Sequence, residues 1–111
     1  MIASIDVTGI KYKVDKKTMK YVNEKVGKLD RYLPSHARKT MTADVKLRQV
    51  NRDHGNKYEA EVIIHVPEKV MTAVDSTTNM MAAIDIVEAK LIAQLHKYKD
   101  ARIARKLAAS T

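Results

Sequence analysis

The sequence predicts an α+β fold, in which one domain runs strand, helix, three strands, helix and forms a four-stranded mixed sheet with both helices packed on one face. Apolar residues recur at spacings of three and four near both ends of the chain, as they do in amphipathic helices. Between them, apolar and polar residues alternate, as they do in strands that bury one face. A length of 111 residues suits a single domain.

The first strand lies at the N-terminus. Apolar and polar residues alternate imperfectly from Ile2 to Thr8, which predicts a strand that ends at Gly9. The helix that follows must cross over the sheet, so the strands on either side of it are expected to pair in parallel.

The first helix is predicted from Lys16 to Leu33, with Asp15 as its N-cap and Pro34 ending it. Gly27 lies inside this segment, where a close approach to the sheet or to a ligand would explain it. One apolar stripe follows the helical spacing and comprises Met19, Val22, Val26, Leu29 and Leu33.

Three strands are predicted next. The first two bury alternating residues, which are Met41, Ala43, Val45 and Leu47 in one and Tyr58, Ala60, Val62, Ile64 and Val66 in the other. Residues 51–56 between them (NRDHGN) have the composition of a turn. Pro67 and Glu68 reverse the chain into a third strand from Lys69 to about Asp75.

The last helix is predicted to begin after Ser76 or Thr78, either of which can cap it. Its apolar stripe holds for five turns and comprises Met80, Ala83, Ile84, Val87, Leu91, Leu95 and Tyr98. The pattern fades beyond residue 100. We therefore expect an α+β domain over residues 1–100 and a basic extension of the last helix over residues 101–111.

Composition narrows the function classes. The chain has 21 Lys and Arg against 13 Asp and Glu, a net charge of +8, which favours a polyanionic partner. The absence of cysteine excludes disulfides, thiolate metal sites and a cysteine nucleophile. The N-terminus lacks the pattern of a secretory signal, and no apolar stretch approaches the roughly 18 residues of a membrane span. A cytoplasmic location without membrane partners is expected.

Basic residues gather on both predicted helices. A mostly positive ridge beside the first stripe comprises Lys17, Lys20, Glu24, Lys28 and Arg31, with Lys25 near its edge. After residue 88, one Asp accompanies Lys90, Lys97, Lys99, Arg102, Arg105 and Lys106. The latter cannot share one helix face, but they can flank the apolar stripe on both sides. Such residues bind phosphates by releasing counterions, although solvated helix faces carry the same residue types.

The kind of nucleic acid follows from what the strands lack. Sheets that bind single-stranded RNA stack bases on aromatic side chains, and here the central strands offer only Tyr58. The sequence has no zinc-finger spacing and no short recognition helix after a tight turn. Recognition of folded RNA through its shape and backbone fits better.

No enzyme signature is present, and neither a cofactor nor a small-molecule substrate is expected. The histidines lack the spacing of metal ligands, and they are His36, His54, His65 and His96. Glu59 and Glu61 share a strand face and could form an acid–base pair or hold a cation, but exposed charges or partners for lysines on neighbouring strands are the better interpretation. Asp85 and Glu88 are interpreted in the same way.

Three segments resemble the family of ribosome hibernation promoting factor and ribosome-associated inhibitor A. They are NMMAAID (Asn79–Asp85), AKLIAQLHKYKD (Ala89–Asp100) and, more loosely, EKVGKLDRYL (Glu24–Leu33). The resemblance implies binding in the decoding region of the small ribosomal subunit. There these factors occupy the space of messenger and transfer RNA and keep ribosomes inactive in starvation or stationary phase.

The resemblance also implies contact residues and a branch of the family. Lys25, Lys28, Lys90, Lys97 and Lys99 match basic positions of the family, whereas Arg102 and Arg105 are added from charge alone. The chain departs from the family pattern at Asn79, Met81 and Ala93, and Ala93 removes one expected phosphate contact. Without an extra domain or an acidic C-terminal extension, it resembles a short-form promoting factor, which we expect to be monomeric when free; a piece of a long member would look the same.

Two alternatives to ribosome binding stay open. One is a general folded or double-stranded RNA-binding module without a ribosomal role. The other is a protein-interaction domain whose basic helices meet an acidic partner.

Overall fold

The computed structural model describes residues 2, 4–50, 55, 57–67 and 69–109, with side chains described up to residue 100 except that of residue 36. The order of its main elements is the predicted one, and the fold class is confirmed. Most of the predicted turn at residues 51–56, and Glu68 of the predicted reversal, lie outside the described residues.

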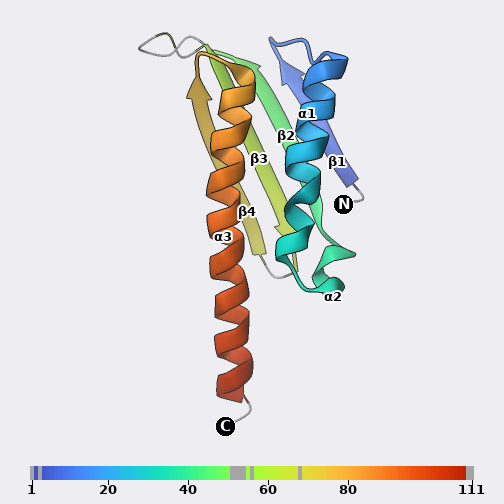
Figure 1. The fold of residues 1–111 in the computed structure, drawn as a ribbon, viewed down its shortest axis with the longest axis vertical. Helices are drawn as coiled ribbons and strands as arrows, with labels where there is room; N and C mark the ends of the chain where they lie inside the picture. The colour runs from blue at the N-terminus through green and yellow to red at the C-terminus, as the bar shows by residue number, and fades with distance from the viewer. Residues whose placement is uncertain (1, 3, 51–54, 56, 68, 110–111) are drawn as a thin grey trace.

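Four strands form one sheet in the order β1-β2-β3-β4 (Figure 1). β1 (Ser4–Ile10) pairs in parallel with β2 (Thr42–Gln49), as the crossover predicts. β3 (Tyr58–Val66) lies antiparallel to β2, and β4 (Lys69–Thr77) antiparallel to β3. The register places Val45 opposite Val62, which in turn lies opposite Ala73, so the buried residues of neighbouring strands meet on one face.

The first helix is shorter than predicted. α1 (Lys16–Gly27) begins after Asp15, whose Oδ1 accepts a hydrogen bond of 2.8 Å from the backbone N–H of Thr18. The chain then continues as a 3-10 helix, η1 (Lys28–Tyr32), and a short helix, α2 (Ser35–Arg38). The carbonyl of Gly27 accepts a bond of 2.9 Å from the N–H of Ile2, which joins the N-terminal segment to the end of α1.

The stripe on α1 also differs by one residue. Val22 and Val26 are buried as predicted, but Met19 is 36% exposed and Thr18 is 4% exposed in its place. Thr18 lies four residues before Val22, whereas Met19 lies three residues before it. The core at this point buries Thr18, the residue at the spacing of four. Its hydroxyl lies 3.3 Å from that of Tyr12, so the buried polar group has a partner.

α3 (Met80–Ala109) buries all seven residues of its predicted stripe. Its cap is Asn79, which corrects the prediction of Ser76 or Thr78. The Oδ1 of Asn79 accepts hydrogen bonds from the N–H groups of Met81 (2.8 Å) and Ala82 (3.3 Å). Ser76 belongs to β4.

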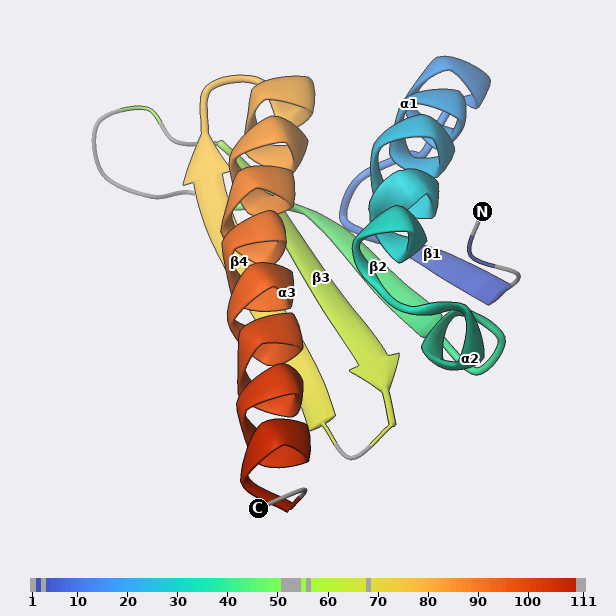
Figure 2. The same cartoon turned by 60° about the horizontal axis from the view of Figure 1, so that its bottom comes forward.

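Both helices cover the same face of the sheet (Figures 1 and 2). α1 lies over β1 and β2, and α3 lies over β3 and β4. Thirty residues make α3 about 45 Å long, whereas nine-residue strands span about 30 Å. The C-terminal part of α3 therefore continues past the end of the sheet.

Candidate nucleic-acid interface

α1 and α3 run side by side in the same direction. Two contacts, one from α1 and one from η1, join α3 to residues that lie 64 positions earlier in the chain. The first is the bond from Tyr21 to Asp85, and the second is the edge-to-face packing of Tyr32 on His96, whose ring centroids lie 5.4 Å apart. This constant offset shows that the helical segments stay in register over about three turns. Lys28 of the first segment therefore lies level with Ile92 of α3.

Asp85 connects the two helices near the start of α3. Its Oδ1 accepts a hydrogen bond of 2.5 Å from the hydroxyl of Tyr21 and lies 3.8 Å from Nζ of Lys25. The hydrogen bond to Asp85, followed by partial burial, raises the pKa of Tyr21 to about 12. The Lys25 ammonium also lies 5.5 Å from the centroid of the Tyr21 ring. Lys25 is thus held at the helix–helix seam.

A groove of about 270 Å³ follows this seam between α1, η1 and α3. Its α1 and η1 wall is mainly basic and its α3 wall is acidic and apolar. The lining residues are Glu24, Lys25, Lys28, Leu29, Arg31, Tyr32, Glu88 and Ile92. Lys28 and Arg31 are exposed, whereas Lys25 is half-buried beside Asp85. The structure therefore brings Lys25 and Lys28 together, with Arg31 beside them.

Arg31 belongs to the predicted ridge but not to the predicted contact residues. Its guanidinium carbon lies 5.2 Å from the centroid of the Tyr32 ring, and its Nη2 donates a hydrogen bond of 3.2 Å to the Tyr32 hydroxyl. A basic residue next to a tyrosine was the signal in the sequence that could have identified Arg31 as a contact residue. The groove that Arg31 and Tyr32 line forms only where η1 packs against α3.

The basic residues of α3 divide between the two flanks of its buried stripe, as expected. Lys90 and Lys97 are two turns apart on the side of β4, and Lys99 is two turns beyond Ile92 on the side of the groove. Lys97 and Lys99 are exposed. Arg102 and Arg105 lie in the part of α3 whose side chains are outside the described residues.

Lys90 differs from the others because the sheet engages its ammonium group. Its Nζ lies 2.9 Å from Oδ2 of Asp75 and donates a hydrogen bond of 3.2 Å to the carbonyl of Val74. The bond from Lys90 is the main cause that lowers the pKa of Asp75. The ammonium group of Lys90 is thus bonded to β4 in the free protein.

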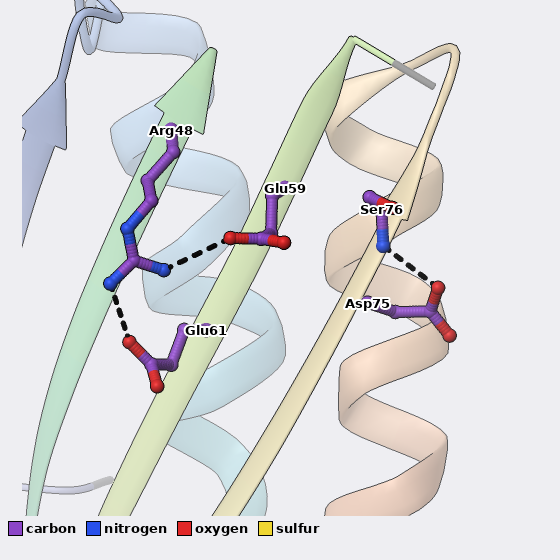
Figure 3. Close-up of polar contacts among 5 residues, drawn as sticks. All are labelled: Arg48, Glu59, Glu61, Asp75 and Ser76. Atoms are coloured by element: carbon purple, nitrogen blue, oxygen red, sulfur yellow. Dashed lines mark hydrogen bonds and ion pairs between the residues drawn. The ribbon is translucent and has the colours of Figure 1, made fainter. Parts of the chain in front are cut away.

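Ion pairs join neighbouring strands on the open face of the sheet. Arg48 joins Glu59 (3.2 Å) and Glu61 (2.7 Å), as Figure 3 shows, so an arginine pairs with both carboxylates where lysines were expected. Oδ2 of Asp44 lies 3.3 Å from Nε2 of His65.

Within the residues that the structure describes, no three His, Asp or Glu side chains are grouped as metal ligands would be. In the same part of the chain, no helix combines the length and apolar character that crossing a membrane requires.

Comparison with known proteins gives one family and several relatives. Residues 5–103 match the family model described as "Sigma 54 modulation protein / S30EA ribosomal protein". A ribosome hibernation promotion factor from Lactococcus lactis subsp. cremoris is 36% identical over 81 residues, which are 71% of this chain and 40% of that protein. A protein of the same name from Picosynechococcus sp. is 32% identical over 87 residues, 78% of this chain and 44% of its own length. The matched segments thus span less than half of these relatives.

Solved structures share the fold. The N-terminal domain of Thermus thermophilus Protein Y superposes with a TM-score of 0.70 at 23% identity, over 87% of this chain and 97% of that one. A ribosomal subunit interface protein from Coxiella burnetii has the same TM-score at 21% identity, over 87% of this chain and 98% of that one.

Proposed function

Because the chain belongs to the Sigma 54 modulation protein / S30EA ribosomal protein family, we propose that it is a ribosome hibernation factor that binds the small ribosomal subunit. The family predicted from Asn79–Asp85 and Ala89–Asp100 is confirmed by this match and by relatives named ribosome hibernation promotion factor. We further propose that it acts in the cytoplasm, in the decoding region, and inhibits translation by occluding messenger and transfer RNA.

The observation that carries this proposal is the parallel pair of basic helices on one side of the sheet. α1 with η1 and α3 stay in register, and their basic side chains line the seam and both flanks of α3. Lysine and arginine on such a surface neutralise backbone phosphates without reading sequence, which suits a folded RNA. The length of α3 beyond the sheet adds reach.

Seven residues are proposed as RNA contacts, and they differ in exposure and in the ion pairs that they form within the protein. Lys28, Lys97 and Lys99 are exposed. Lys25 forms an ion pair with Asp85, and Lys90 forms one with Asp75. We therefore expect smaller losses of RNA affinity when Lys25 or Lys90 is replaced. Arg102 and Arg105 complete the set from their charge and their place in α3.

The test is co-migration with ribosomal subunits in a sucrose gradient, using two variants of equal charge. Lys28→Ala/Lys97→Ala removes two exposed charges from the helices, whereas Lys46→Ala/Lys69→Ala removes two from the strands. We expect the helix variant to lose co-migration with the small subunit and the strand variant to keep it. Wild-type binding should weaken with salt at a logarithmic slope of about 0.7–0.9 per neutralised phosphate.

Three results would contradict the proposal. Equal losses in both variants would mean that net charge alone drives binding. Binding of double-stranded RNA as tight as that of small subunits would favour the general RNA-binding module. Binding that ignores salt would exclude phosphate contacts as its basis.

A further inference from the structure

β4 forms one edge of the sheet and carries an unusual run of residues for an exposed edge. Val70–Val74 (VMTAV) has no charge, and the run is bounded by Lys69 and Asp75. Val70 and Val74 are 56% and 38% exposed on the face that no helix covers. An edge strand of this kind is a template for pairing with another strand, because its outer backbone groups are free to bond.

Side chains of α3 occupy the outer edge of β4. Nε2 of Gln94 donates a hydrogen bond of 2.9 Å to the carbonyl of Thr72, and Nζ of Lys90 donates one of 3.2 Å to the carbonyl of Val74. Four residues of helix rise about 6 Å, and two residues of strand about 6.6 Å. The i, i+4 spacing of α3 therefore matches the spacing of successive outward carbonyls on β4.

The polar contacts continue at the Asp75 end of this edge. Asp75 accepts a bond of 2.7 Å from the N–H of Ser76 through Oδ1, as Figure 3 shows, and its Oδ2 is held by Lys90. The side chains of Gln94, Lys90 and Asp75 thus bond to backbone groups of β4 at Thr72, Val74 and Ser76.

We propose that Lys90 and Gln94, with Asp75, close the β4 edge against pairing with the β4 strand of a second copy of this chain. A second copy suits the edge because two uncharged VMTAV runs can pair antiparallel without placing like charges in the middle of the ladder. This inference does not depend on the proposed ribosomal function. It also gives Lys90 a second role, which is to cover the edge of β4 in the free protein.

The test is sedimentation velocity of the full chain over a range of concentrations. Lys90→Met/Gln94→Leu keeps side chains of similar length but removes the donors to Val74 and Thr72. Lys20→Met/Gln49→Leu makes the same two chemical changes at exposed positions of α1 and β2, away from the β4 edge. We expect a faster species in the first variant, with a fraction that rises with concentration, and no such species in the control or the wild type.

Hydrogen exchange then shows which strand forms the contact between copies. The single variants test the proposal if the double variant does not fold. Amides of β4 should exchange several-fold more slowly in the associated species than in the dilute one. If the double variant unfolds by circular dichroism, Lys90→Met and Gln94→Leu alone, each retaining one donor, should still associate more than the control. A folded double variant that stays a single species, single variants no different from the control, or protection of β1 instead of β4, would overturn the proposal.

Discussion

Tyr21 and Asp85 show at the residue scale how the two helices are joined. The phenol of Tyr21 donates to the Asp85 carboxylate, and ionisation of the phenol would place two negative charges in contact. The folded pKa of about 12 lies above the ordinary value of 10.0, so the contribution of this bond to stability is full below pH 10. It is lost as pH rises from 10.0 to about 12.

We therefore predict that one tyrosine titrates near pH 12 in the folded protein. The measurement is ultraviolet absorbance of tyrosinate against pH, taken as the difference between wild type and Tyr21→Phe. Asp85→Asn removes the carboxylate whose hydrogen bond and charge raise the pKa of Tyr21 and should move this titration back toward pH 10. A difference curve centred at pH 10 in the wild type would show that the Tyr21–Asp85 bond is absent in solution.

At the scale of elements, α3 depends on Asn79 for its start. The side chain satisfies two N–H groups of the first turn, which otherwise have no partner in the helix. We predict that Asn79→Ala lowers the free energy of unfolding by about 1 kcal/mol. Thr78→Ala serves as the matched control, because Thr78 is an exposed neighbour that the sequence also favours as a cap.

Denaturant unfolding of both variants checks this prediction. The control should stay within about 0.5 kcal/mol of the wild type. A larger loss for Thr78→Ala than for Asn79→Ala would mean that α3 begins elsewhere in solution. The five proposed RNA contacts on α3 all lie beyond its first turn. Fraying of that turn should therefore weaken ribosome binding much less than the loss of Lys97 does.

At the scale of the whole molecule, the proposed mechanism is occlusion without a chemical step. The sequence has no nucleophile paired with a base and no nucleotide-binding loop. We predict that inhibition of translation saturates near about one protein per ribosome, as expected for a binding factor without turnover.

Titration of purified ribosomes in a translation assay measures this stoichiometry. Initiator transfer RNA with messenger RNA should compete with the protein, and ribosomes washed in high salt should recover activity with their RNA intact. Inhibition far below equimolar protein, or cleaved RNA after washing, would reveal a catalytic activity instead.

Periodicity along the chain was enough to predict which residues of several strands and helices are buried. Alternation placed Ala43, Val45 and Leu47 on the buried face of β2, and helical spacing identified every buried residue of the α3 stripe. The parallel pairing of β1 and β2 followed from the crossover between them. The family followed from local motifs on the same helix.

Other features depend on contacts between distant segments and could not be predicted before the folded chain was seen. The bond from Ile2 to Gly27 accompanies the end of α1, and the reach of Lys90 and Gln94 to β4 depends on where α3 lies across the sheet. The groove at Lys28 and Arg31 likewise exists only when η1 packs on α3. The spacing of residues along a chain specifies which face of an element is buried, but the partner that a polar side chain reaches depends on how the elements pack.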